Sequence, residues 1–394
     1  MKTKLILFLF CINLFSNCSP KPSISGILET SKNTDFQPKV YLVQPQNLDE
    51  IAASFLGKVI DSAMVAEDGT FSFQHLPRVS QSTLFELTVQ KKGDPPNKLN
   101  NEDTTLPNYM PVVWQTGETL QISADLDHFQ NSFQINNPSP ENTALLKLRN
   151  LKGKAFQQYL QNKSWDVHKG SQLLEKEEAL LNYQKQLIDF AENTDQLLAA
   201  LVAVRWVSPQ NDYERVPEFL FQQCEKWNAK ASDESWVQQL CNKAKKEKLP
   251  LLKGAVFPNV SLPMVNGDTL SVYSQLGKKL TVIDLWASWC VPCRKENRET
   301  LVPLWDQYHN QGLRVIAYGL ETNEEAWKKA IEIDGAYRWL HASHLQGDDA
   351  PFMKSLRIQT IPANFILDAQ GKVIAKNVHG KALQQFVSAY LDKQ

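Results

Sequence analysis

The sequence is short of several features that would narrow its function. Neither sign of charge is in excess, since 42 Lys and Arg residues stand against 43 Asp and Glu residues, so nothing indicates a nucleic-acid partner. Cysteine is scarce, with six residues in a chain of 394. Beyond the N-terminus, no apolar run is long enough to span a bilayer as a helix. A chain of this length can still form two or three domains with hydrophobic cores.

The N-terminus has the layout of a secretory signal. Lys2 and Lys4 precede an apolar run over residues 5–15, which is too short for a membrane span. The following "LFSNCS" resembles the lipobox of bacterial lipoproteins, although Asn17 and Phe15 depart from the usual residues. The resemblance implies a signal peptide over residues 1–18 that ends at a lipidated Cys18. It also implies a bacterial cell-envelope location, with the protein held at the membrane by its lipid.

Three regions follow, and together they predict a multidomain α+β protein. Residues 24–136 contain short β-rich runs such as "KVYLVQ" and "FELTVQ", and Asp68-Gly69 is typical of a hairpin turn, so a β-sandwich is expected. Residues 139–250 have helical periodicity, beginning with Ser139 as a cap and Pro140 at the first helical position. Residues 252–394 alternate strands and helices, which is typical of an α/β sheet with helices on its faces.

A Cys-x-x-Cys pair lies in this last region, in "WASWCVPCRKE". Cys290 and Cys293 follow a buried strand, "LTVIDLW", and begin a helix, whose N-terminus stabilises a thiolate. We expect Cys290 to be the exposed nucleophile and Cys293 to be the more buried resolving thiol. A zinc site would need two more ligands, and His341 and His344 have no matching setting. A purely structural staple is disfavoured because the loop it closes is too small.

Around this pair the sequence resembles the TlpA-like thiol–disulfide oxidoreductases, which are thioredoxin-fold proteins of bacterial cell envelopes. The resemblance covers residues 252–394 and rests on "IDLWASWCVPCRKE", "IQTIPANFILDAQGKVI" and the lead-in "FPNVSLPMVNGDTLSVYSQLGKK". It implies that Pro362 forms a cis-proline loop facing the active site, rather than an ordinary strand-start proline. Asp284 matches the buried acid that helps to deprotonate the second cysteine. It could instead point outwards at a strand end. Trp289 is expected to pack beside the disulfide and limit access.

The resemblance also implies the partners, namely protein thiols and disulfides and a membrane redox partner that supplies electrons. It favours a reductant without a cofactor, while an oxidant or an isomerase stays open. A ligand-binding lipoprotein with a secondary redox domain is the rival from another class. Two departures from the family pattern stand out, Val291-Pro292 between the cysteines and Asn297-Arg298 where proline is common. The regions before residue 252 resemble the extensions of some membrane-anchored relatives only weakly.

Two further cysteines can form a structural disulfide. Cys224 and Cys241 lie on consecutive predicted helices, with "AKASD" between them as the expected turn. Placing the turn there leaves the two residues at unequal distances from it, an axial offset of about 6 Å. The bridge then requires tilted helices or an asymmetric turn. Two separate core thiols are the alternative.

Overall fold

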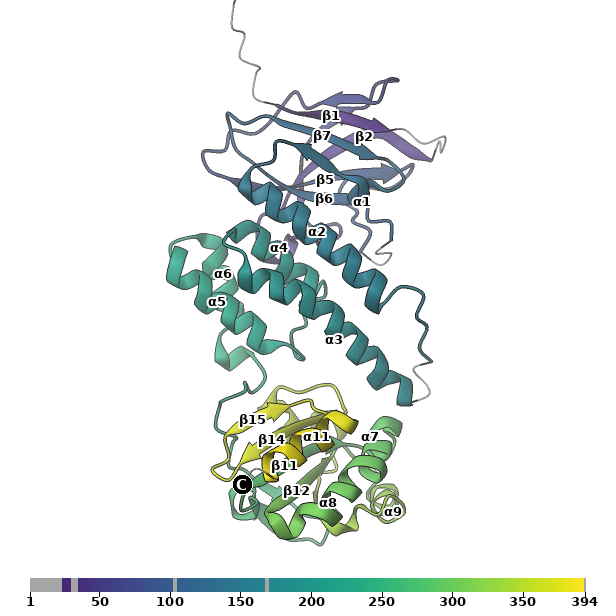
Figure 1. Cartoon of the computed structure of the whole chain (residues 1–394), viewed down its shortest axis with the longest axis vertical. Coiled ribbons are helices and arrows are strands. Elements are labelled where there is room, and N and C mark those ends of the chain that lie inside the picture. The colour runs from purple at the N-terminus through teal and green to yellow at the C-terminus, as the bar shows by residue number, and fades with distance from the viewer. Residues whose placement is uncertain (1–22, 30–34, 102–104, 167–169, 393–394) are drawn as a thin grey trace, which may run out of the picture.

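The computed structural model describes residues 23–29, 35–101, 105–166 and 170–392. Its three parts follow one another along the long axis of the molecule, from the sheets near the N-terminus to the C-terminal domain (Figure 1). The expected signal peptide and Cys18 lie outside the described residues. Within the described ranges, none of the helices combines the length and the apolarity that a membrane crossing requires.

The N-terminal region contains two four-stranded sheets, in the orders β4-β1-β7-β8 and β3-β2-β5-β6. Neighbouring strands are antiparallel except β1 and β7, which run parallel. The strands are β1 (Ile24–Glu29), β2 (Phe36–Gln44), β3 (Lys58–Met64), β4 (Thr70–Ser72), β5 (Thr83–Lys91), β6 (Tyr109–Trp114), β7 (Leu120–Asp125) and β8 (Gln134–Asn136), and helix α1 (Phe129–Ser132) precedes β8.

The hairpin predicted at Asp68-Gly69 is wrong in one respect. The chain does turn there, with the Gly69 N–H donating to the Ala66 carbonyl at 2.9 Å, but β3 and β4 belong to different sheets. The partner of β4 is β1, and the Leu28 N–H donates to the Gly69 carbonyl at 2.9 Å. A Cβ at residue 69 would lie 2.2 Å from the Leu28 carbonyl oxygen, so the close approach of β1 requires glycine.

Five helices form the middle region, and the predicted start of the first is confirmed. Ser139 caps it by accepting a hydrogen bond from the Asn142 N–H at 3.3 Å, and Pro140 occupies its first turn. The helices are α2 (Pro140–Tyr159), α3 (Gly170–Asn193), α4 (Leu197–Val207), α5 (Pro217–Ala231) and α6 (Ser235–Lys243). Helix α4 is buried along nearly its whole length, as its almost uniformly apolar sequence requires.

Buried apolar residues form two separate clusters. One cluster joins the two N-terminal sheets to the helices of the middle region, and the other belongs to the C-terminal domain. The predicted boundary between residues 136 and 139 therefore separates two kinds of secondary structure that share a core. The division of residues 24–250 into two domains stays a prediction.

The C-terminal domain has a five-stranded sheet in the order β13-β12-β11-β14-β15. Its central strand β11 is buried at every residue, as the apolar run predicted, and pairs parallel to β12 and antiparallel to β14. A separate hairpin of β9 and β10 contains the predicted Asn266-Gly267 turn. The strands are β9 (Ser261–Pro263), β10 (Thr269–Ser271), β11 (Leu280–Trp286), β12 (Leu313–Gly319), β13 (Leu340–Ala342), β14 (Ala363–Asp368) and β15 (Val373–Lys376).

The helix after the cysteine pair is not regular. The helices of this domain are α7 (Val291–Glu296), α8 (Val302–Tyr308), α9 (Glu324–Ile333), α10 (Pro351–Leu356) and α11 (Gly380–Leu391). A π-helical turn over Asn297–Leu301 joins α7 to α8, and the Val302 N–H donates to the Asn297 carbonyl across it. Pro303 has no N–H with which to continue an α-helical ladder, so a widened turn just before it absorbs the mismatch.

Cys224 and Cys241 form a disulfide between α5 and α6, with their Cα atoms 4.8 Å apart. The expected axial offset is wrong because α5 continues through Ala231, so the turn is centred on Asp233. The two cysteines lie nine and eight residues from that point and therefore face each other. A nearly symmetric helical hairpin places them within bonding reach without unusual tilt.

We expect this disulfide to stabilise the helical region. Closing a 17-residue loop reduces the entropy of the unfolded chain, and Cys224→Ser with Cys241→Ser should lower the unfolding free energy by about 3 kcal/mol. Denaturant unfolding followed by circular dichroism, without added thiol, measures the difference. An unchanged midpoint would mean that the bond has no stabilising role.

Candidate active site

The predicted nucleophile and resolving cysteine are joined as a disulfide at the carboxyl end of the central strand. Strand β11 ends at Trp286, and Cys290 caps α7, with its sulfur accepting a hydrogen bond from the Cys293 N–H at 3.3 Å. Pro292 occupies the first turn of α7, where its missing N–H removes no helical hydrogen bond. The first turn therefore points a backbone N–H at the sulfur that becomes a thiolate on reduction.

Both cysteines are buried, which corrects the expectation of an exposed Cys290. Cys290 is 5% exposed and Cys293 is 2% exposed. The exposed residues are instead the neighbours of Cys290, with Trp289 at 64% and Val291 at 56%. Trp289 is thus turned largely towards solvent.

Asp284 lies within β11 and is 3% exposed, so the alternative of an outward-pointing side chain is wrong. Its backbone lies between Ala317 of β12 and Asn364 of β14. Burial raises the pKa of the Asp284 carboxyl well above its usual value, and the nearby Glu296 raises it further. The carboxyl is therefore suited to hold or accept a proton behind the disulfide. Its part in deprotonating Cys293 stays a prediction.

Glu296 is a second buried acid that the sequence interpretation left without a role. It ends α7, three residues after Cys293, and is 4% exposed. Burial raises its pKa to about 7, while a hydrogen bond from the Gly380 N–H, 3.1 Å from each carboxylate oxygen, opposes that rise. Asp284 and Glu296, the acidic pair, are thus two buried acids whose ionisation is disfavoured by burial, and the charge of Glu296 further disfavours the ionisation of Asp284.

His379 lies beside this pair but does not neutralise it. Its Nδ1 atom is 3.9 Å from Glu296 Oε1, and burial lowers the pKa of the imidazole to about 4, with the positive charge of Arg215 adding to the effect. The ring is therefore uncharged near neutral pH. Its Nε2 atom is buried and has no hydrogen-bond partner within the part of the chain that the structure describes.

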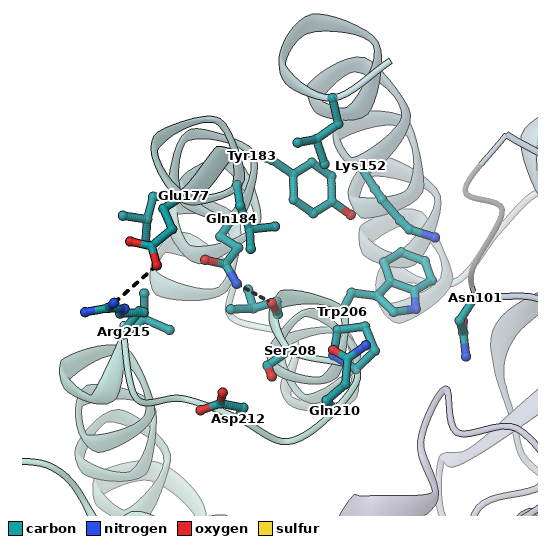
Figure 2. A pocket seen from close by; sticks show the side chains of 16 residues that line it. Asn101, Lys152, Glu177, Tyr183, Gln184, Trp206, Ser208, Gln210, Asp212 and Arg215 are labelled. Atoms are coloured by element: carbon teal, nitrogen blue, oxygen red, sulfur yellow. Dashed lines mark hydrogen bonds and ion pairs between the residues drawn. The ribbon is translucent and has the colours of Figure 1, made fainter. Parts of the chain in front are cut away.

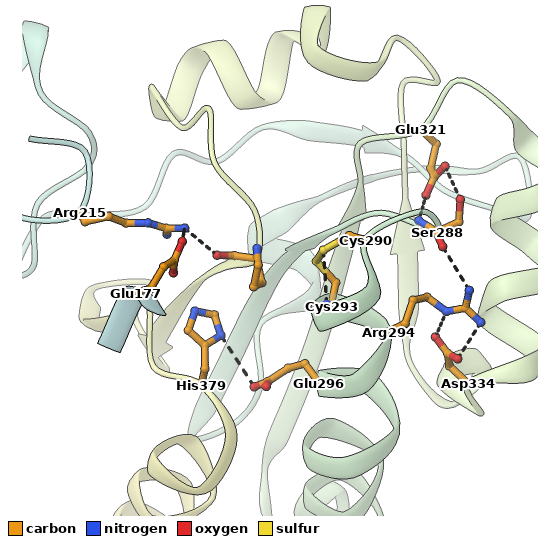
Figure 3. Close-up of a disulfide and its surroundings, with 11 residues drawn as sticks. Glu177, Arg215, Ser288, Cys290, Cys293, Arg294, Glu296, Glu321, Asp334 and His379 are labelled. Atoms are coloured by element: carbon orange, nitrogen blue, oxygen red, sulfur yellow. Dashed lines mark hydrogen bonds and ion pairs between the residues drawn. A yellow bond between two sulfur atoms is a disulfide. The ribbon is translucent and has the colours of Figure 1, made fainter. Parts of the chain in front are cut away.

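Another group of side chains, which we name the Ser288 brace, holds the backbone that precedes Cys290. Glu321 accepts hydrogen bonds from the N–H and the hydroxyl of Ser288, while Arg294 donates to the Ser288 carbonyl at 3.2 Å. Asp334 binds both Arg294 and Arg298. Figure 3 shows this brace on one side of the disulfide, with Arg215 and Glu177 on the other. The brace limits the movement of the loop that positions the nucleophile.

The Ile361–Pro362 peptide bond is cis. Pro362 directly precedes β14, whose first residue, Ala363, pairs with Leu285 near the end of β11. The proline is thus at the same edge of the sheet as the disulfide. Its carbonyl accepts a hydrogen bond from Arg215 of the middle region at 3.1 Å.

The two histidines considered as zinc ligands contact different groups. His341 is buried in β13 with Nε2 against the Ala336 carbonyl at 2.8 Å, whereas Nδ1 of His344 meets the Tyr318 hydroxyl at 2.6 Å. Within the part of the chain that the structure describes, no three His, Cys, Asp or Glu residues gather as metal ligands would.

Comparison with known proteins bears on the C-terminal domain. Residues 252–389 match the model of the Redoxin family. The chain is 28% identical over 128 residues to the thiol:disulfide interchange protein DsbE of Pseudomonas fluorescens, covering 32% of this chain and 66% of that protein. It is 25% identical over 150 residues to the thiol-disulfide oxidoreductase ResA of Bacillus cereus, covering 38% of this chain and 82% of that one.

Among solved structures, the thioredoxin domain of a thiol-disulfide oxidoreductase from Bacteroides vulgatus is 30% identical, with a TM-score of 0.33. The match covers 36% of this chain and 99% of that domain. A disulfide between the central strand and a helix, level with a cis-proline, defines the thioredoxin-like class of domains. Within that class, residues 252–389 resemble a Redoxin domain, and the two curated relatives above are named a thiol:disulfide interchange protein and a thiol-disulfide oxidoreductase.

We predict that Asp284→Asn slows the attack of Cys293 on a mixed disulfide by at least about tenfold near neutral pH, because the step loses its proton acceptor. In the wild type this rate should rise with pH as the acidic pair loses a proton. In the variant the rise should move towards the ordinary thiol pKa of about 8.5. Single-turnover kinetics across pH measure both effects, with exposed Asp348→Asn as the control.

The stability of the same variant separates a chemical role from a structural one. The folded-state pKa of Asp284 is raised, so the stability that its protonated form contributes is lost as pH rises through that pKa. Asp284→Asn cannot ionise, and its unfolding midpoint should therefore fall less than that of the wild type over this range. A pH–rate profile identical to that of the wild type would contradict the proton-acceptor role.

Proposed function

We propose that the whole protein exchanges disulfides with the thiols and disulfides of exported proteins, acting as a reductant. The observation that carries this proposal is the Cys290–Cys293 disulfide at the N-terminus of α7, in a domain that also buries the acids Asp284 of β11 and Glu296 of α7. This arrangement contains a nucleophile, a resolving thiol and a proton acceptor, which are the groups that thiol–disulfide exchange requires.

The reductive cycle begins from the dithiol form. The Cys290 thiolate attacks one sulfur of a substrate disulfide, forming a mixed disulfide and releasing the other substrate sulfur as a thiolate. Cys293 loses its proton to the acidic pair, and its sulfur then attacks Cys290, releasing the second substrate thiol. The substrate gains two electrons, and the protein is left with the Cys290–Cys293 disulfide. A membrane redox partner would return two electrons to this disulfide.

The reductant role is favoured by the resemblance to TlpA-like proteins, while an oxidant or isomerase would use the same residues. The reduction potential of the Cys290–Cys293 pair distinguishes them, because reductants of about −270 mV and oxidants of about −120 mV are well separated. A potential at the oxidising end of that scale would overturn the direction and leave the exchange chemistry intact.

Insulin reduction with dithiothreitol tests the assignment of the two cysteines. Cys290→Ser should abolish catalysis because the attacking sulfur is lost. Cys293→Ser should instead accumulate mixed disulfides with substrate, visible on non-reducing gels, because nothing resolves them. Full activity in Cys290→Ser would show that the nucleophile is elsewhere, and the Cys224→Ser, Cys241→Ser double variant is the control for cysteine loss in general.

We also propose that the protein is exported to the cell envelope and held at the membrane through a lipid on Cys18. The support is the signal layout of residues 1–18 and the lipobox-like "LFSNCS". Mass spectrometry of the N-terminal peptide from membrane-purified protein should find an acylated Cys18 as the first residue, and Cys18→Ala should release the protein from membranes. An unmodified Cys18 inside a longer N-terminus would contradict the anchor.

A cavity in the middle region favours the ligand-binding alternative. It has a volume of about 460 Å³ and is lined by side chains of α3 and α4, among them Tyr183, Gln184 and Trp206 (Figure 2). Lys152 lies at its wall, with Nζ 4.5 Å from the centre of the Trp206 ring, and burial lowers the Lys152 pKa to about 8. If ligand binding were the principal function, replacing both Cys290 and Cys293 would leave the cellular role intact.

A further inference from the structure

The middle region makes direct hydrogen bonds to the loop that ends in the cis-proline. In the segment between α4 and α5, the Glu214 carboxylate accepts hydrogen bonds from the backbone N–H groups of Gln359 at 2.8 Å and Thr360 at 3.1 Å. The next residue, Arg215, donates to the Pro362 carbonyl at 3.1 Å and to Glu177 of α3 at 3.2 Å. We name Glu214 and Arg215 the clamp.

The backbone groups held by the clamp are those that an incoming chain would use. Gln359 and Thr360 precede β14, so their N–H groups lie outside the strand pairing of the sheet. Free backbone groups beside a strand are a template on which an extended peptide adds by main-chain hydrogen bonds. A carboxylate acceptor forms stronger hydrogen bonds than a peptide carbonyl does, so Glu214 competes well for both positions.

The same segment stands beside the disulfide. Figure 3 shows Arg215 and Glu177 approaching Cys290 and Cys293 from the side opposite the Ser288 brace. Both sulfurs belong to residues that are at most 5% exposed. A polypeptide that pairs with the Gln359 and Thr360 N–H groups of this loop must displace the Glu214 carboxylate from them.

The hydrogen bonding of the clamp is incomplete, which makes its displacement by a substrate feasible. Two nitrogens of Arg215, Nε and Nη1, are buried and have no hydrogen-bond partner among the described residues. Buried donors without a partner are unfavourable, so they offset part of the free energy with which the clamp holds the loop. Separate contacts remain when it opens, since Glu218 of α5 binds the side chain of Lys376 at 2.9 Å and the Lys253 N–H at 2.8 Å. The clamp can therefore release the loop without separating the two regions.

We propose that Glu214 and Arg215 are specificity-determining residues of the disulfide site. They hold the cis-proline loop against protein substrates until an extended segment, from an unfolded chain or a loop, replaces them with its own backbone hydrogen bonds. Small thiols need no pairing with the loop, so the clamp slows their reaction with the disulfide less than it slows the reaction of protein substrates. The inference rests on the proposed function, because it concerns which disulfides reach Cys290.

Glu214→Ala in the full chain tests the clamp, because Glu214 holds the loop without contacting the acidic pair behind the disulfide. The ratio of two rates is measured, that of insulin reduction and that of dithiothreitol reducing the Cys290–Cys293 disulfide. Losing two charge-assisted hydrogen bonds should raise this ratio about 3- to 10-fold. Glu225→Ala, which removes an exposed carboxylate of α5, is the matched control and should leave the ratio unchanged.

Amide hydrogen exchange gives a readout that does not depend on activity. Gln359 and Thr360 should exchange faster in Glu214→Ala than in the wild type, while amides of β11 should not change. An unchanged or lower rate ratio would overturn the clamp, even if the wild type reduces insulin through Cys290. If neither the wild type nor the variant reduces insulin although dithiothreitol reduces the disulfide, the proposed function fails, and the clamp fails with it.

Discussion

The burial of two carboxyl groups is the constraint on which the redox site depends. Asp284 comes from the middle of the sheet and Glu296 from the end of α7, and neither has a buried cation to neutralise it, because burial keeps His379 uncharged. Near neutral pH, the two carboxyls are therefore only partly ionised. The domain therefore holds two buried groups that can bind a proton near neutral pH, one on β11 and one at the end of α7.

That arrangement explains why the surrounding fold is so constrained. Strand β11 must be central to bury Asp284, and α11 must begin where the Gly380 N–H can reach Glu296. The Ser288 brace holds the loop between strand and helix, which fixes the disulfide relative to both acids. The π-helical turn after Glu296 then lets the helix continue past Pro303 without moving α7.

Local patterns were enough to predict the elements that carry the cysteines. The apolar run of β11, the capping residues of α2 and the position of Cys290 at a helix start all follow from nearest neighbours along the chain. Pro362 could be singled out only through the resemblance to a family, whereas Asp284 also stood out as a carboxylate inside the apolar run of β11. The pairing of Asp284 with Glu296, and the burial of Cys290, depend on contacts between segments that no local pattern records. Arg215, which lies 147 residues before Pro362, is the clearest case.

Other misses have equally physical causes. Asp68-Gly69 does form a turn, but turn chemistry does not say whether the strands on either side pair with each other, and β1 takes β4 as its partner instead. The offset expected for Cys224 and Cys241 came from ending α5 too early. Helix ends are set by packing as well as by capping residues, and moving this one by three residues brings the two cysteines opposite each other.

Strand β1, the first described strand, pairs with β4 on one side and β7 on the other, so it is an interior strand of its sheet. Only five residues separate its first residue, Ile24, from Cys18, so six Cα-to-Cα steps limit their distance to about 22 Å even in a fully extended chain. With a lipid on Cys18, the sheets would stand close to the bilayer surface. The redox domain, at the opposite end of the long axis, would then face the aqueous space (Figure 1). The sheets and helices would thus act as a stalk that sets the working height of the disulfide above the membrane.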